Sequence, residues 1–240
     1  MIVGSIKEDI NLEKRVSITP ETAKKIISLG LNINLEKSYA IHLGIEDKQY
    51  EAAGVNFYNS SKEVINNSNL ILKVNCPTDE EIKNLKEKTI LVGIFNPSNN
   101  QEKLKEVLKK SISIFSLELL PRISRAQSMD VLSSQSNLAG YRAVIESIYE
   151  FEKAIPMMMT AAGTIPAAKV LVIGAGVAGL QAIATAKRLG AIVSATDVRA
   201  ASKEQVESLG GKFLMVEQEE NLETAGGYAK EASEEFKKKQ

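Results

Sequence analysis

The sequence predicts an α/β protein built from two doubly wound parallel-sheet domains. Short apolar runs alternate with helical patterns along most of the chain, and strands separated by helices form parallel sheets with right-handed crossovers. A length of 240 residues gives room for two domains, and 44% hydrophobic with 25% charged residues is ordinary for a globular protein. We place the first domain at residues 1–138 and the second at residues 139–240.

Five apolar runs predict the strands of the first domain, at residues 2–6, 32–36, 70–74, 90–95 and 112–117. Residue pairs typical of helix starts lie between these runs: Thr19 with Pro20, Thr78 with Glu81, and Ser98 with Gln101. The alternation indicates a flavodoxin-like first domain. A long helical pattern at residues 127–152 then leads into the second domain.

The second domain contains the motif that is most informative about function. Four apolar residues, Val170 to Ile173, run directly into Gly174-Ala175-Gly176-Val177-Ala178-Gly179, which has the spacing Gly-x-Gly-x-x-Gly. In a dinucleotide site the first glycine permits a tight turn, the second lets the backbone approach a pyrophosphate, and the third lets the helix pack closely on the strand. The N–H groups at the start of that helix bind the phosphates.

An acidic residue completes the motif. Asp197 follows the next apolar run, and 197 − 174 = 23 positions separate it from Gly174. Its carboxylate accepts hydrogen bonds from a ribose 2′-hydroxyl but repels a 2′-phosphate, so the sequence predicts a site for NAD(H) rather than NADP(H). The alternative, a purely structural glycine turn, does not account for the acid in this position.

The second domain is expected to be a partial Rossmann fold. Strands at residues 170–173, 192–196 and 212–216, with helices at 177–189 and 202–209, supply one half of the full six-stranded arrangement. Ser202 with Gln205 predicts a capping box for the second helix. The strand at 170–173 would then be an open sheet edge, so we expect a C-terminally truncated chain. A half-domain that pairs with another chain is the alternative.

Composition excludes several other classes of function. Thirty basic and thirty acidic side chains cancel, and neither sign forms a long block, so no nucleic-acid partner is expected. Cys76 is the only cysteine and cannot form an internal disulfide, which agrees with a cytoplasmic location. No metal site is predicted.

Three segments resemble the family of alanine dehydrogenases and the NAD-binding component of proton-translocating NAD(P) transhydrogenase. The segment Arg15-Val16-Ser17-Ile18-Thr19-Pro20 is similar to one shared by both enzymes. The block from Pro121 to Arg142 resembles the transhydrogenase alone, and so do the glycine loop with Asp197-Val198-Arg199 and the segment Gly226-Gly227-Tyr228. The resemblance covers nearly the whole chain.

The resemblance implies a function and a set of site residues. It implies hydride transfer from NADH to NADP+ held on a separate domain, coupled to proton movement through a membrane domain, in a homodimeric component that is peripheral to the inner membrane through its partners. Catalytic roles fall on Arg122, Gln127 and Asp130, which orient the nicotinamide. Cofactor contacts fall on the following residues: Ser133, Gly174, Gly176, Val177, Ala178, Gly179, Asp197, Val198, Arg199 and Tyr228.

Side-chain chemistry is consistent with these roles. A carboxamide requires both a donor and an acceptor to fix its ring, and Arg122, Gln127 and Asp130 supply both. Hydride transfer requires two rings in near contact, so positioning is the main task of the protein. A capped helix start is the alternative reading of the same residues, because Ser128-Met129-Asp130 also reads as a first helical turn.

Two other functions stay open. An alanine dehydrogenase-like enzyme must also move a proton. The resemblance implies that this family does so with a histidine after the fourth strand, where residues 93–100 contain none. His42, the only histidine, reads as structural. Arg15 and Lys73 match that family's carboxylate-binding pair, but we favour a structural ion-pair role for them. A catalytically inert NAD-binding fragment is the third possibility.

Overall fold

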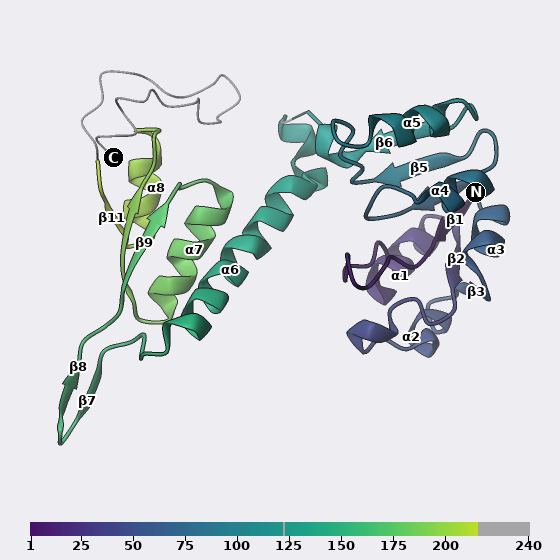
Figure 1. The fold of residues 1–240 in the computed structure, drawn as a ribbon. Coiled ribbons are helices and arrows are strands. Elements are labelled where there is room, and N and C mark those ends of the chain that lie inside the picture. The colour runs from purple at the N-terminus through teal and green to yellow at the C-terminus, as the bar shows by residue number, and fades with distance from the viewer. Residues whose placement is uncertain (122, 216–240) are drawn as a thin grey trace. The chain divides into compact units, whose positions relative to one another are not determined.

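The computed structural model describes residues 1–121 and 123–215, which form parts of two compact units (Figure 1). Unit 1 comprises Met1–Met129 and unit 2 Asp130–Gln240. The division therefore lies somewhat earlier than the predicted domain boundary after residue 138, because the whole of the long helix belongs to unit 2.

Unit 1 is built on a six-stranded parallel sheet with the order β3-β2-β1-β4-β5-β6. Five of its strands were predicted. The sixth, β3, was not, because Asn56-Phe57-Tyr58 is too short to show an apolar run. The strands are β1 (Ile2–Ser5), β2 (Asn32–Glu36), β3 (Asn56–Tyr58), β4 (Leu70–Leu72), β5 (Ile90–Gly93) and β6 (Ser113–Ser116).

The additional strand changes the topology. Without β3, the five predicted strands lie in the order 2-1-3-4-5, which is the flavodoxin-like order. With β3 paired to the outer side of β2, the order becomes 3-2-1-4-5-6, which is that of a complete dinucleotide fold. The flavodoxin-like description of the first domain is corrected accordingly.

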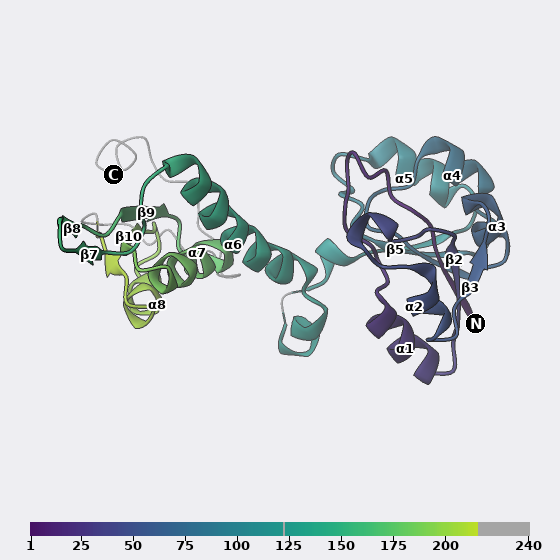
Figure 2. The same cartoon turned by 90° about the horizontal axis from the view of Figure 1, so that it is seen from below.

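Helices cover both faces of this sheet. Ile71 of β4 packs into a core with α3, α4 and α5, whereas its neighbours Leu70 and Leu72 pack with α1 and α2 on the opposite face. Figure 2 shows these two groups on either side of the strands. The helices are α1 (Pro20–Ser28), α2 (Asp47–Glu51), α3 (Ser61–Asn66), α4 (Asp79–Asn84) and α5 (Gln101–Leu108).

The predicted helix starts are partly confirmed. Thr19 caps α1 with Pro20 in its first turn, and Thr78 forms the expected capping box with Glu81 at α4. The prediction at Ser98 was wrong, since α5 begins after Asn100 without a side-chain cap. The capping box predicted at Ser202 was also wrong. Ser202 is already the first residue of α8, the N-cap is Ala201, and no side-chain hydrogen bond caps this helix.

Up to residue 215, the described part of unit 2 combines a three-stranded parallel sheet, ordered β11-β10-β9, with three helices and a hairpin. Its three strands and the helices between them were predicted, and α6 and α7 pack on each other. The elements are α6 (Val131–Phe151), β7 (Met158–Thr160), β8 (Gly163–Ile165), β9 (Lys169–Ile173), α7 (Val177–Arg188), β10 (Ile192–Thr196), α8 (Ser202–Ser208) and β11 (Lys212–Phe213).

One face of this sheet is buried and the other is exposed. Val193 and Ala195 of β10 lie in the core with α6, α7 and α8, while Leu171 and Ile173 of β9 are 56% and 75% exposed. Among the described residues β9 pairs only with β10, so the predicted open edge is confirmed. The three parallel strands with α7 and α8 between them form the partial Rossmann fold predicted for the second domain.

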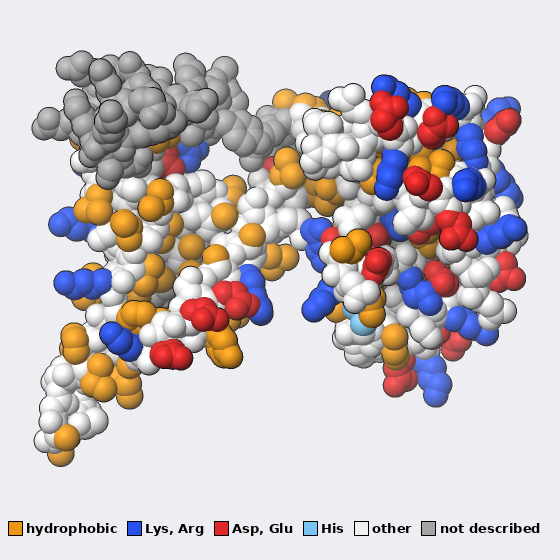
Figure 3. Space-filling model, in the orientation of Figure 1, with side chains coloured by type: hydrophobic (Ala, Val, Ile, Leu, Met, Phe, Trp, Pro, Cys, Tyr) orange, Lys and Arg blue, Asp and Glu red, His pale blue; other side chains and the backbone are white. Residues whose placement is uncertain are grey.

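A short antiparallel hairpin, β7 with β8, projects from unit 2 and was not predicted (Figure 1). All six of its strand residues are exposed. Exposed apolar side chains gather on it and on the neighbouring strands of unit 2 (Figure 3), among them Met158, Met159 and Ile165.

Candidate functional site

The glycine loop joins β9 to α7 through a tight turn. Gly174 has φ +93, a left-handed conformation that favours glycine, and its N–H donates to the carbonyl oxygen of Thr196 at 2.8 Å. This hydrogen bond ties the end of β9 to the end of β10. The predicted role of Gly174 in the turn is therefore supported by its backbone geometry.

The start of α7 lies close to this turn. A Cβ on Gly179 would overlap the carbonyl oxygen of Gly174, so only glycine allows the helix to pack this closely on the loop. Gly176 is the N-cap and supplies no side chain, and no side-chain hydrogen bond caps the helix there. The N–H groups of the first turn, which begins with Val177 and Ala178, therefore point to an anion as their partner.

Asp197 lies directly after β10, next to the glycine loop. Its Oδ2 accepts a hydrogen bond from the Ala175 N–H at 2.6 Å, and its Oδ1 accepts one from the Arg199 N–H at 2.8 Å. The Arg199 side chain adds two more hydrogen bonds, from Nε to Oδ1 and from Nη2 to Oδ2, each 2.9 Å. The structure thus brings together Ala175, Asp197 and Arg199.

These hydrogen bonds keep the carboxylate charged. Burial raises the pKa of Asp197, but donors on Arg199 and Ala175 outweigh this effect and hold the pKa below its ordinary value of 3.8. The Asp197 side chain is only 4% exposed and that of Arg199 17%. Asp197 is therefore ionised at neutral pH, as recognition of a ribose hydroxyl requires.

The pairing of Asp197 with Arg199 was not predicted. The signal was present in the sequence, because an acid two residues before an arginine can accept hydrogen bonds from the backbone N–H and from the guanidinium of that arginine. Glu13 and Arg15 show the same arrangement in unit 1, with the Arg15 N–H 2.9 Å and Nε 2.8 Å from Glu13 Oε1. Val198, between Asp197 and Arg199, is half-buried.

The other predicted site residues fall into three groups. Asp130 is the N-cap of α6, where it accepts from the Ser133 N–H at 2.9 Å and from Ser133 Oγ at 2.6 Å. Gln127 is exposed on a 3-10 helix, Ser124–Met129, of unit 1. Arg122 and Tyr228 lie outside the described residues.

The capping geometry of Asp130 bears out the alternative reading of this segment as a capped helix start. It does not exclude a second role, because a carboxylate accepts about four hydrogen bonds.

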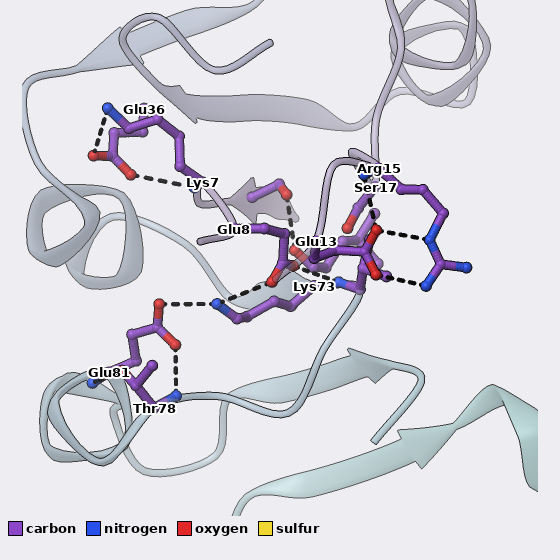
Figure 4. A network of polar contacts seen from close by, with 12 residues as sticks. Lys7, Glu8, Glu13, Arg15, Ser17, Glu36, Lys73, Thr78 and Glu81 are labelled. Atoms are coloured by element: carbon purple, nitrogen blue, oxygen red, sulfur yellow. Dashed lines mark hydrogen bonds and ion pairs between the residues drawn. The ribbon is translucent and has the colours of Figure 1, made fainter. Parts of the chain in front are cut away.

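Arg15 and Lys73 form ion pairs within unit 1 (Figure 4). Lys73 is 4% exposed, and its Nζ lies 2.9 Å from Glu81 Oε1 and 3.4 Å from Glu8 Oε2. Arg15 Nη2 lies 2.6 Å from Glu13 Oε2. These partners support the structural ion-pair role that we favoured over binding of a substrate carboxylate.

The surroundings shift the pKa values of Glu8 and Glu13 in opposite directions. Burial raises the pKa of Glu8 above 4.5 despite the opposing charge of Lys73 and the Val74 N–H, which donates to Glu8 Oε1 at 2.7 Å. Hydrogen bonding from the Arg15 side chain lowers the pKa of Glu13. His42 is exposed, with Nε2 2.8 Å from the carbonyl oxygen of Lys14, which fits a structural role.

Comparison with known families decides which group of proteins the chain resembles. Residues 4–139 match the model of the alanine dehydrogenase/PNT N-terminal domain, and residues 143–237 match that of the C-terminal domain. The chain belongs to the alanine dehydrogenase/PNT family. This confirms the resemblance found in the sequence, and it supports binding of a nicotinamide nucleotide.

Within the alanine dehydrogenase/PNT family, the chain is more similar to transhydrogenases than to alanine dehydrogenases. It is 52% identical over 235 residues to an NAD(P) transhydrogenase alpha subunit of Rhodospirillum rubrum, a match that covers 95% of this chain and 61% of that protein. The solved transhydrogenase from Sinorhizobium meliloti has a TM-score of 0.86 and 50% identity, covering 90% of this chain and 64% of that one.

Similarity to an alanine dehydrogenase is lower. The enzyme from Methanococcus maripaludis is 29% identical over 201 residues, covering 82% of this chain and 53% of that protein. The chain thus spans less than two thirds of the length of each of these relatives. None of the helices in the described part of the chain is long and apolar enough to cross a lipid bilayer.

Proposed function

We propose that this chain is the NAD(H)-binding component of a proton-translocating NAD(P) transhydrogenase, which transfers a hydride from NADH to NADP+ bound on a partner domain. The observation that carries the proposal is the glycine loop with an ionised Asp197 hydrogen-bonded to Ala175 N–H. The transhydrogenase names of relatives about half identical to this chain support it further.

The charge of Asp197 favours NAD(H) over NADP(H) at this loop. An ionised carboxylate accepts hydrogen bonds from the hydroxyl groups of the adenosine ribose, and it repels a phosphate on the 2′ position. The start of α7, which no side-chain hydrogen bond caps, favours the pyrophosphate through its first-turn N–H groups. In this proposal NADP(H) binds only to the partner domain.

Nicotinamide orientation falls to Arg122, Gln127 and Asp130, with Ser133 as a further contact and Tyr228 in a segment that closes over the cofactor. When bound, the nicotinamide supplies the hydride chemistry. The chain itself contributes hydrogen bonds to the carboxamide and excludes water from the ring. No general base on this chain is required, because the transfer moves a hydride alone.

The proposed partners are the NADP(H)-binding domain and the membrane proton-channel domain of the transhydrogenase. Binding to them would hold this component on the cytoplasmic face of the inner membrane. The word "subunit" in the name of the Rhodospirillum rubrum relative supports an assembly of this kind.

We also propose a homodimer, with the β7–β8 hairpin in its interface. Met159 is 75% exposed at this hairpin, and exposed methionines are typical of adaptable protein-binding surfaces. We expect wild-type protein to sediment as a dimer and Met159→Lys to shift the population toward monomer. A wild-type protein that sediments as a monomer at all concentrations would contradict this assignment.

Hydride transfer can be tested with isotopically labelled NADH. The chain is mixed with NADH deuterated at C4, with NADP+ and with the NADP(H)-binding component of a relative. We expect deuterium to appear in NADPH, since the transfer is direct. The label is measured by mass spectrometry.

Two control measurements, an assay with L-alanine and a titration with NADH, distinguish the two alternative functions. Reduction of NAD+ by L-alanine would instead indicate an alanine dehydrogenase-like enzyme. Binding of NADH without transfer to NADP+ and without reduction of NAD+ by L-alanine would indicate an inert NAD-binding module.

A further inference from the structure

We propose that Arg199 is a specificity-determining residue, whose guanidinium is held by Asp197 and thereby kept from binding a 2′-phosphorylated adenosine. The inference rests on the proposed function, in which the glycine loop binds the adenosine half of NAD(H). It assigns the choice between the two coenzymes to the Asp197–Arg199 pair rather than to the carboxylate alone.

The geometry of the pair is that of a bidentate contact. Arg199 Nε and Nη2 lie 2.9 Å from the two different oxygens of Asp197, which is the arrangement that arginine forms with carboxylates. The same planar fork also fits two oxygens of a phosphate. The group that best suits a 2′-phosphate is therefore present in the site, bound to an acid of this chain.

The guanidinium lies within reach of the glycine loop. Arg199 Nη2 is 3.9 Å from the point where a Cβ of Gly176 would be. Asp197 contacts the same loop through the Ala175 N–H. A phosphate on the ribose 2′-oxygen would therefore meet both members of the pair.

The carboxylate has no acceptor position to spare. From described residues Asp197 accepts four hydrogen bonds, one from Ala175 and three from Arg199, which matches the roughly four acceptor positions of a carboxylate. A ribose hydroxyl that donates to Asp197 must therefore replace or share one of them. The Arg199 side chain, 17% exposed, is the donor that can move, because the other two are backbone groups.

The charges of Asp197 and Arg199 act in opposite directions on the binding of a 2′-phosphate. The pair is neutral as a whole, so a 2′-phosphate gains attraction from Arg199 only by competing with Asp197, while the carboxylate repels it. If the carboxylate is replaced by an amide, the guanidinium is no longer held by the charge of Asp197 and can bind the phosphate. If Arg199 is replaced, the repulsion by Asp197 is no longer offset.

The effect of each of the two side chains on affinity can be measured with two ligands that occupy only the adenosine half of the site. ADP carries a ribose with a free 2′-hydroxyl, and adenosine 2′,5′-bisphosphate carries the 2′-phosphate. Calorimetric titration of the 240-residue chain gives both dissociation constants for wild type, Asp197→Asn, Arg199→Gln and the double variant. Thermal melting of each variant shows whether it is folded.

We expect wild type to prefer ADP and Asp197→Asn to bind the bisphosphate at least about tenfold more tightly than wild type does, the size of one charge-assisted hydrogen-bonded contact. The double variant should lose this gain. Arg199→Gln should increase the preference for ADP over the bisphosphate. Arg199→Gln tests the proposal even if Asp197→Asn does not fold. A merely structural Arg199 would leave the ratio of the dissociation constants for ADP and the bisphosphate unchanged.

Several results would overturn the inference. They are a gain in bisphosphate affinity that persists in the double variant, a folded Asp197→Asn without any gain, and an unchanged ratio in Arg199→Gln. If these occur while wild type binds ADP, the proposed function stands and only the role of Arg199 falls. If wild type binds neither ADP nor NADH, the proposed function and the inference fall together.

Discussion

Replacing Lys73 by methionine should destabilise unit 1 by about 3–5 kcal/mol, since it leaves buried carboxylates without their cation. Lys73 is 4% exposed and lies between Glu8 and Glu81, which are 6% and 15% exposed. The free energy of unfolding is measured by urea denaturation at pH 7. Lys25→Met is a matched control, because the pair of Lys25 with Glu21 is exposed to solvent, which screens it, so its loss should change the free energy of unfolding little.

The stability lost in Lys73→Met should depend on pH. Because burial raises the folded-state pKa of Glu8, the folded protein holds that proton more tightly than the unfolded chain does. Ionised Glu8 therefore lowers stability above its folded pKa, and this cost disappears as the pH falls toward 4.5. Without Lys73 the cost is larger, so the difference between Lys73→Met and wild type should shrink on acidification. A difference at pH 7 no greater than that of Lys25→Met would contradict the buried network.

Alanine substitutions at two glycines of the loop should separate folding from binding. Gly179→Ala places a Cβ against the carbonyl oxygen of Gly174, so α7 must move away from the loop. We expect a loss of stability of about 1–3 kcal/mol or more, together with loss of nucleotide binding. Thermal melting and titration with ADP measure the two effects.

Gly176→Ala is the matched comparison. Gly176 has φ −77, which alanine adopts without strain, and the nearest atom to its Cβ position is Arg199 Nη2 at 3.9 Å. Its melting temperature should stay close to wild type, while the added methyl group obstructs the approach of the pyrophosphate and weakens ADP binding. Wild-type stability in Gly179→Ala, or wild-type affinity in Gly176→Ala, would refute the roles assigned to these glycines.

The sequence predicted those parts of the fold whose signals are local and regular. The strand at 170–173, the glycine loop and α7 were all identified, because an apolar run, a turn that favours glycine and a helical pattern follow each other directly. Thr19 and Thr78 were identified as caps for the same reason. By contrast, β3 has three residues, and the β7–β8 hairpin has no buried face that would produce an alternating pattern.

The site could be predicted less completely than the fold. Asp197 was found from its distance to the glycine loop, but its four hydrogen bonds depend on how Arg199 and Ala175 are placed in three dimensions. The partners of Lys73 depend on tertiary structure in the same way, since Glu8 is distant in sequence and reaches Lys73 only after β1 and β4 pair. Spacing alone cannot supply such contacts.

The central claim is that the glycine loop and Asp197 bind NAD(H) in preference to its 2′-phosphorylated form. Calorimetric titration of the chain with NADH and with NADPH tests it most directly. We expect saturable heat with NADH and markedly weaker binding of NADPH. No heat with NADH, or tighter binding of NADPH, would contradict the claim.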